Sequence, residues 1–188
     1  MSPEWLTAIG TLGTFVVIAA SAIAALMQLR HLRASNQIAA LNETRERVES
    51  PEFQEFVRKA RELPRYMADP ATRKRLLAPE MDFPGEFQWL LVLMYFYEHL
   101  GILVKNGVID RTIACETWAI PLLTYWPNLA PIVANRRAAL HTPALWENFE
   151  YLIALCRQWI ATHPNGAYPP NAPRVPLPEL WPEVTDVT

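Results

Sequence analysis

The sequence lacks the short motifs that would assign a catalytic chemistry. It contains no GxSxG, GxxxxGK[ST], GxGxxG or HExxH segment and no EF-hand loop. The common signatures of esterases, P-loop NTPases, dinucleotide-binding enzymes, zinc proteases and calcium sensors are therefore missing. The chain also lacks an excess of positive charge, since 17 basic and 19 acidic residues give a net charge of −2. Nucleic-acid-binding proteins usually carry a basic face, so we expect no nucleic-acid partner.

Potential metal ligands are few and widely spaced. Cys115 and Cys156 lie in apolar segments far apart in the sequence, and we expect two buried, reduced thiols, because a disulfide would need an oxidising compartment. None of the four histidines has a cysteine, histidine or acidic residue three or four positions away, which is the spacing that places ligands on one helix face. Glu147 and Glu150 could share a divalent ion, but two carboxylates alone are weak evidence and a solvated helix face is the simpler explanation. We expect no metal and no cofactor.

The first part of the chain has a long run without charge. The 25 residues between Glu4 and Arg30, which include GTFVVIAASAIAALMQL, carry no charged side chain. As a helix they would span ~37 Å, whereas crossing the hydrocarbon core of a membrane takes ~20 residues. Trp5 precedes the run and Arg30 and Arg33 follow it, as is typical of the two membrane interfaces. The sequence therefore favours a transmembrane anchor over residues 1–30.

Two other interpretations of this run stay open. A cleaved signal peptide could use the small residues Ala22, Ala24 and Ala25 as its cleavage site, although the acidic Glu4 stands where a signal peptide has positive charge. A buried helix of a soluble domain is the third interpretation, but such helices usually carry a polar stripe.

The charges that flank the run predict its orientation. Arginines follow it at positions 30, 33, 45 and 47, and no basic residue precedes it. The positive-inside rule then places the N-terminus outside and the remaining chain in the cytoplasm. We therefore expect a single-pass protein located in the bacterial inner (cytoplasmic) membrane.

Small residues recur within the predicted anchor. Gly10 and Thr14 are four positions apart, as are Ala20 and Ala24. This spacing lets two membrane helices approach closely, so these residues are candidates for a helix–helix face in a homo-oligomer or with a membrane protein partner. Small residues are also common in membrane helices that do not associate.

The remaining sequence predicts an all-α fold. No segment shows the alternating pattern of a strand, and Ser50-Pro51, Asp69-Pro70 and Thr142-Pro143 each combine a capping residue with a proline suited to the first turn of a helix. Pro121 is expected to kink or divide its helix. The expected order is a stalk that continues the anchor to about Ser50, a helix from Pro51, and helices at 71–77, 86–106, 111–125, 127–137 and 142–162.

These elements define three parts: the anchor at 1–30, a stalk and cytoplasmic helical domain at 31–163, and a tail at 164–188. The helix at 86–106 is apolar enough to be the buried centre of the domain, with contact to the membrane as the alternative. The tail contains seven prolines, so we expect extended structure there. Leu180 and Trp181 either dock onto the domain or a partner, or lie in a disordered tail.

Basic residues are candidates for contact with membrane lipid. Arg30 and Arg33 directly follow the anchor, and Arg73, Lys74 and Arg75 occupy one short helix. Because the domain is tethered to a membrane, these residues could bind anionic headgroups. A solvated face is the simpler explanation for the second group.

Glu98 and His99 are weak candidates for catalysis. They interrupt the most apolar helix of the domain, where a carboxylate is unfavourable unless it is paired. A functional carboxylate with a perturbed pKa would fit this position. A structural ion pair or hydrogen bond, for example to Arg111 or Arg157, explains the same residues.

Four segments resemble those of a known family. They are TFVVIAASAIAALMQLRHLRASNQIAAL, SPEFQEFVRKA, FYEHLGILVKNGVID and TPALWENFEYLIAL. In this order they are similar to bacterial single-pass membrane proteins whose small helical cytoplasmic domain has no known function. The resemblance covers about residues 13–159 and leaves out the tail. It implies a membrane anchor and a helical domain, and it implies no activity.

The sequence thus favours a membrane-anchored interaction or regulatory module. An enzyme with an unrecognised site around Glu98 and His99 is one alternative, and a self-associating membrane subunit is another.

Overall fold

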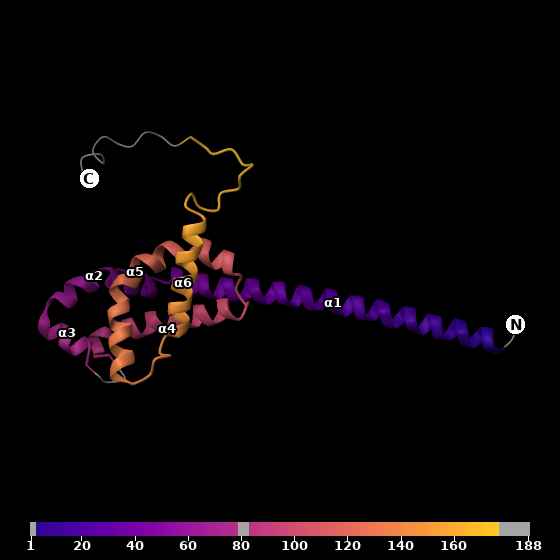
Figure 1. Ribbon diagram of the computed structural model, residues 1–188, viewed down its shortest axis with the longest axis horizontal. Coiled ribbons are helices and arrows are strands. Elements are labelled where there is room, and N and C mark those ends of the chain that lie inside the picture. The colour runs from indigo at the N-terminus through magenta and orange to yellow at the C-terminus, as the bar shows by residue number, and fades with distance from the viewer. Residues whose placement is uncertain (1–2, 79–82, 177–188) are drawn as a thin grey trace.

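The computed structural model describes residues 3–78 and 83–176, with the side chains of all but residues 5–9. Within these residues the chain is helical and contains no strand (Figure 1). The fold class predicted from the sequence is therefore confirmed. The elements are α1 (Pro3–Glu49), α2 (Pro51–Ala68), α3 (Pro70–Leu76), a 3-10 turn η1 (Gly85–Phe87), α4 (Gln88–Lys105), α5 (Arg111–Ala139) and α6 (Glu147–Thr162).

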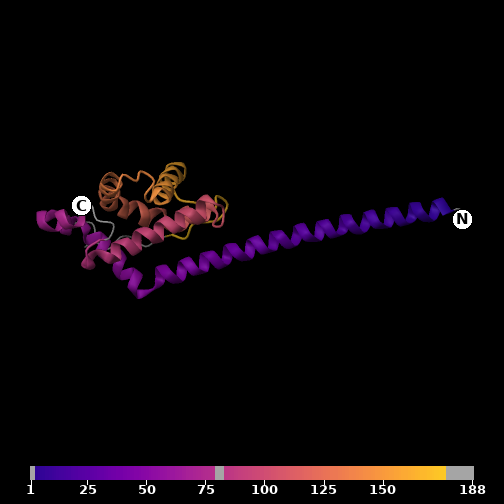
Figure 2. The ribbon, with the colours of Figure 1, turned by 90° about the horizontal axis from the view of Figure 1, so that it is seen from below.

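Helix α1 is one uninterrupted helix of 47 residues. Figures 1 and 2 show that its N-terminal part projects from the bundle formed by the other helices. Large apolar side chains there are open to solvent, and Phe15 is 68% exposed. Near the C-terminal end the helix turns apolar side chains toward the bundle, where Ala40, Leu41 and Val48 pack against the core. The predicted continuation of the apolar helix into a stalk is thus observed.

Two helices are long and apolar enough to cross a membrane by length and composition, one within α1 and the other comprising η1 and α4. They differ in burial. None of the apolar segment in α1 is buried, whereas half of the apolar segment in α4 is buried. Helix α4 contributes Leu90, Leu93, Met94 and Leu100 to the hydrophobic core. The structure therefore places α4 in the centre of the bundle, where it packs mainly against α6.

Local capping sets the starts of α2 and α3. Ser50 Oγ accepts a hydrogen bond from the backbone N–H of Phe53 at 3.3 Å, and Asp69 Oδ2 accepts one from that of Thr72 at 2.8 Å. These bonds satisfy N–H groups that have no partner within their own helix. Both starts agree with the sequence prediction.

The prediction of two helices at 111–125 and 127–137 is wrong, because α5 is a single helical run from Arg111 to Ala139. Pro121, Pro127 and Pro131 all lie inside it, and the ribbon changes direction along its length (Figure 1). Proline removes a backbone hydrogen bond and bends a helix without necessarily ending it. Pro127 and Pro131 are exposed, so both prolines lie on the solvent side of the helix.

The predicted start of the last helix at Thr142-Pro143 is also wrong. Helix α6 begins at Glu147, and Trp146 before it adopts a left-handed conformation with φ 55°. The hydroxyl of Thr142 donates to the carbonyl of Leu140 and does not cap a helix. The preceding turn, which ends in Trp146, therefore delays the helix by several residues.

The chain after α6 is irregular up to the end of the described part. Residues 163–176 are exposed and contain no helix, in agreement with the prediction for the first half of the tail. Leu180 and Trp181, which were expected to dock or remain free, lie outside the described residues, as does the side chain of Trp5.

Candidate functional site

Glu98 lies at the contact between α4 and α6. Its Oε1 accepts a hydrogen bond from the side-chain amide of Asn148 at 2.6 Å, and its Oε2 accepts one from the backbone N–H of Phe149 at 2.9 Å. Phe149 is the third residue of α6, so its N–H has no partner within that helix. Glu98 therefore caps α6 from outside. The structural explanation is the one observed, with Asn148 and Phe149 as partners in place of Arg111 or Arg157.

Gly101 brings the two helices together one turn further along α4. A Cβ atom at this position would lie 2.1 Å from the carbonyl oxygen of Asn148, a distance that two such atoms cannot adopt. Lys105 follows one turn later, and its Nζ donates to Asn148 Oδ1 at 3.1 Å and lies 3.7 Å from Glu147 Oε1. The face of α4 formed by Glu98, Gly101 and Lys105 thus holds the first turn of α6.

His99 points to a different part of the molecule. It is exposed and lines a small cavity of about 100 Å³ between α4 and the stalk, together with Glu43 and Arg47 of α1. Glu98 contacts α6, whereas His99 faces α1. The two residues proposed as a catalytic pair are therefore not brought together into one site.

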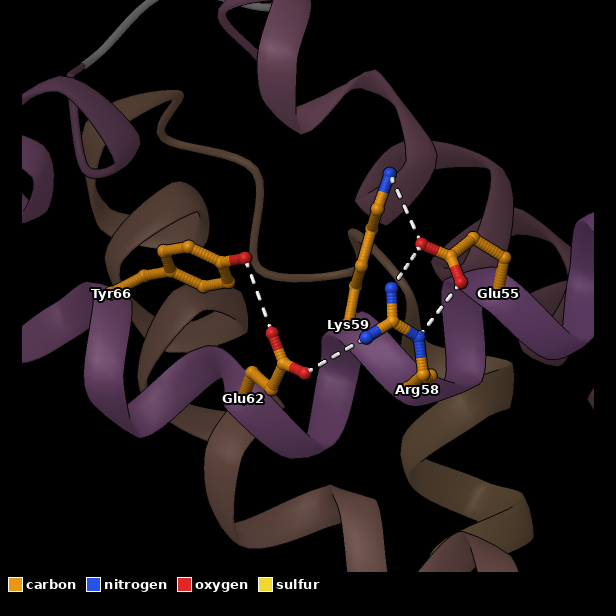
Figure 3. Close-up of polar contacts among 5 residues, drawn as sticks. All are labelled: Glu55, Arg58, Lys59, Glu62 and Tyr66. Atoms are coloured by element: carbon orange, nitrogen blue, oxygen red, sulfur yellow. Dashed lines mark hydrogen bonds and ion pairs between the residues drawn. The ribbon is translucent and has the colours of Figure 1, made fainter.

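Polar contacts are denser on the surface of α2, where four charged residues and a tyrosine form a chain (Figure 3). Arg58 contacts Glu55 at 2.7 Å and Glu62 at 3.2 Å, while Lys59 lies 3.9 Å from Glu55. Arg58 hydrogen-bonds to the Glu55 carboxylate and so lowers the pKa of that group below its usual value. These side chains are solvated, so we interpret the network as a charged helix surface and not as a binding site.

The acidic residues considered as metal ligands and the two cysteines all lie beside other side chains of the domain. Glu150 pairs with Arg137 at 2.6 Å and Glu147 lies near Lys105, so each carboxylate faces a cation. Within residues 3–78 and 83–176, no group of three or more histidine, cysteine or acidic side chains could hold a metal ion. Cys115 and Cys156 are free and buried, with their sulfur atoms 3.9 Å apart.

The small residues of the predicted helix–helix face are open. Gly10, Thr14, Ala20 and Ala24 are all exposed, and nothing lies within 4 Å of a Cβ atom placed on Gly10. The Thr14 hydroxyl donates to the Gly10 carbonyl at 2.9 Å, so it is satisfied within its own helix. A second helix could therefore approach this face without displacing any part of the described chain.

The two groups of basic residues lie at opposite ends of the domain. Helix α3, with Arg73, Lys74 and Arg75, is at the end far from the projecting part of α1 (Figures 1 and 2). Arg75 also forms an ion pair with Glu86. Arg30 and Arg33 belong to α1, where they line a cavity shared with the turn between α4 and α5.

Comparison with known families accounts for most of the chain. Residues 15–159 match the family described as Domain of unknown function (DUF4760). The chain belongs to this family. The DUF4760 match begins in the apolar part of α1 and ends in α6, so it includes most of α1 and nearly all of the bundle. No curated protein and no solved structure is significantly similar to this chain.

Sequence analysis missed one buried charge in this DUF4760 domain. Arg136 is 1% exposed, donates from Nη2 to the carbonyl of Leu76 at 3.3 Å, and places its guanidinium 4.3 Å from the ring centre of Phe83. It therefore connects α5 to the segment around α3 and η1. In the sequence Arg136 and Arg137 resemble a solvated basic pair, and only the spacing of Arg136 from the buried residues Leu129, Ile132 and Val133 indicates its inward position.

Proposed function

We propose that this chain is a single-pass membrane protein whose helical domain acts as an interaction or regulatory module at the cytoplasmic face of a bacterial inner membrane. The observation that carries the proposal is the continuity of α1. A fully exposed apolar segment passes without a break into a stalk that packs on the domain core. Apolar surface of this extent is unfavourable in water and favourable in lipid.

The arrangement of the polar residues supports an interaction role over catalysis. Glu98 is used to cap α6, and His99 faces α1, so the strongest catalytic candidates have separate structural environments. The domain also presents large apolar side chains to solvent, including Ile120 at 76% exposure and Tyr95 at 55%. Exposed apolar side chains of this kind are available to a protein partner.

Two measurements on intact cells test location and orientation. Alkaline carbonate extraction should leave the full-length protein in the membrane pellet, as expected for a spanning helix. External protease added to spheroplasts should remove an N-terminal epitope tag and leave a C-terminal tag intact. Recovery in the soluble fraction, or loss of the C-terminal tag, would contradict the proposal.

A third measurement tests the interaction role. A photo-crosslinking amino acid at Ile120 or Tyr95 should capture one partner protein at near-stoichiometric yield in living cells. The same amino acid at Arg157, which is exposed on α6, is a control for random collisions. Equal labelling from all three positions would argue against a defined partner surface.

A self-associating membrane subunit is the second candidate function. The exposed small face with Gly10 and Ala24 supports it, because close approach of two membrane helices requires small side chains. The oligomeric state of the full chain in detergent distinguishes this candidate from a monomeric module.

A further inference from the structure

The side of α1 that faces the bundle changes character along its length. Residues 30, 33, 37, 44 and 48 share one side of the helix by their spacing of three, four and seven. At the C-terminal end of α1 the bundle covers this side, because Thr44 is buried and Val48 packs on the core. Toward the anchor the same side carries Arg30, Arg33 and Gln37. Charged and amide side chains therefore replace apolar ones on the side that faces the protein.

These polar residues line a cavity of about 800 Å³. The opposite wall is the turn between α4 and α5, which Figure 2 shows reaching back along α1 toward its N-terminal half. The cavity is thus formed by two segments far apart in the sequence. Its lining residues are Arg30, Arg33, Ala34, Asn36, Gln37, Asn106, Gly107 and Val108.

The charge of the cavity is positive. No ion pair joins Arg30 or Arg33 to a carboxylate of the described residues, and no acidic residue lines the cavity. Asp110, the first acidic residue after the turn, accepts from the backbone N–H groups of Thr112 and Ile113. Its carboxylate is therefore committed to capping α5.

Side chains, and not the backbone, must supply the donors in this cavity. The N–H groups of Asn106, Gly107 and Val108 already bond to the carbonyl groups of the last turn of α4. The guanidinium groups of Arg30 and Arg33 and the side-chain amides of Asn36 and Gln37 remain. Guanidinium groups bind phosphate through paired, charge-assisted hydrogen bonds.

The position of the cavity relative to the anchor restricts the source of the phosphate. The apolar segment from Gly10 to Leu29 would span ~30 Å as a helix, which equals the hydrocarbon thickness of a bilayer. Arg30 and Arg33 then lie at the depth of the lipid headgroups. The turn between α4 and α5 reaches the same depth, whereas α3 lies at the far end of the domain.

We infer that the cavity between Arg30, Arg33 and the α4–α5 turn binds the phosphate group of an anionic phospholipid. This inference rests on the proposed membrane location. The bound headgroup would lie between the anchor and the domain and would hold the α4–α5 turn at the membrane surface. The cavity between α1 and the bundle is then filled by a lipid headgroup and not by water alone.

Native mass spectrometry of the full-length protein in detergent tests the inference. Phosphatidylglycerol and phosphatidylcholine with the same acyl chains are added separately, and the bound lipid is counted on each variant. The double variant Arg30→Gln/Arg33→Gln removes the charge, and Val108→Trp fills the cavity while the charge stays. Arg73→Gln/Lys74→Gln removes two charges from α3 and is the matched control.

The wild-type protein and the α3 control should retain phosphatidylglycerol over phosphatidylcholine. Loss of both arginines should weaken binding about thirtyfold, since each cation near anionic lipid contributes roughly a factor of five. Val108→Trp should also abolish the preference. Because the protein is purified in detergent, lipid binding is measured independently of any change that the arginine substitutions cause in the orientation of the protein in the cell membrane.

Each of the following results would overturn the inference. Equal retention by all variants would remove the cavity as the site. Sensitivity to the arginines but not to Val108→Trp would indicate diffuse surface charge. Saturation by free glycerol phosphate, with no preference between the two lipids, would assign the cavity to a soluble phosphate compound. A wild-type protein that is membrane-bound but shows none of these preferences would leave the proposed function standing, whereas a protein recovered as soluble would contradict both.

Discussion

The carboxylate of Glu98 and the backbone N–H of Phe149 join α4 to α6 at 2.9 Å. Helix α6 has no side-chain cap of its own, because the residue before it is Trp146 in a left-handed conformation. Glu98 supplies the missing acceptor from another helix, and its negative charge also interacts favourably with the N-terminal end of the α6 dipole. The start of α6 therefore depends on correct packing against α4.

Glu98→Ala should lower the free energy of unfolding by about 2 kcal/mol, and Glu98→Gln by about 1 kcal/mol, because glutamine keeps one acceptor oxygen and loses the charge. Thermal unfolding of the full chain in detergent, followed by circular dichroism, measures both. Glu46→Gln is the control, since Glu46 is exposed on the stalk. Any cellular phenotype should fall in proportion to the folded protein. A stable Glu98→Gln protein that has lost its phenotype would favour a chemical role for this carboxylate.

Gly101→Ala should destabilise the bundle more strongly than either change at Glu98. The new methyl group would meet the backbone carbonyl of Asn148, which cannot move without shifting α6. We expect a loss of about 2–4 kcal/mol in the free energy of unfolding, as for other overpacked cores. Gly85→Ala is the control, because nothing lies within 4 Å of its Cβ position. Equal unfolding temperatures for the two variants would mean that α4 and α6 are further apart than described.

The sequence predicts those features of the fold that depend on neighbouring residues. Ser50 and Asp69 cap the helices that directly follow them, and the apolar length of α1 is visible without any tertiary contact. The start of α6 depends on Glu98, about fifty positions away, so the local signal at Thr142-Pro143 was misleading.

The same reasoning applies to the candidate sites. The sequence marks Arg30 and Arg33 as the first charged residues after the long apolar segment, but the second wall of their cavity comes from residues 106–108 and requires the fold. Glu98 and His99 are adjacent in sequence, yet side chains one position apart on a helix point about 100° from each other. Adjacency therefore suggested a pair that the helix separates.

Arg136→Ala should destabilise the domain by about 3 kcal/mol, because it removes a buried side chain together with its contacts to Leu76 and Phe83. The change would loosen α3 and η1 from α5. Chemical denaturation of the full chain in detergent measures the loss. Arg157→Ala, at an exposed position of α6, is the control and should change stability by less than about 0.5 kcal/mol. Similar effects of the two substitutions would contradict the buried position of Arg136.

The two neighbouring buried thiols of Cys115 and Cys156 should make the free energy of unfolding depend on pH in the alkaline range. Burial raises the pKa of both Cys115 and Cys156 above the ordinary thiol value. A group whose folded pKa is raised contributes stability that is complete below its unfolded pKa, about 8.5, and is lost as the pH rises toward the folded pKa. The free energy of unfolding should therefore fall between about pH 8.5 and 9.5.

The double variant Cys115→Ala/Cys156→Ala should show a smaller decline over that interval, measured by urea denaturation at several pH values. Burial also raises the pKa of Tyr97, so the comparison stays below about pH 10, at which an unfolded tyrosine is already half ionised. In the wild-type protein, iodoacetamide should modify the native thiols much more slowly than those of the unfolded chain. Rapid modification of the native protein would show that the two sulfur atoms are accessible.

Gly10→Leu tests the small face of α1. If two anchors associate through this face, the larger side chain should prevent close approach and shift the full-length protein toward monomer, by about tenfold in dissociation constant. Analytical ultracentrifugation in detergent at matched density measures the change. Val17 is exposed at 64% in the same apolar segment, and Val17→Leu is a control that adds bulk without replacing a small residue. An unchanged oligomer in Gly10→Leu would exclude this face, and a monomeric wild-type protein would exclude self-association through α1 altogether.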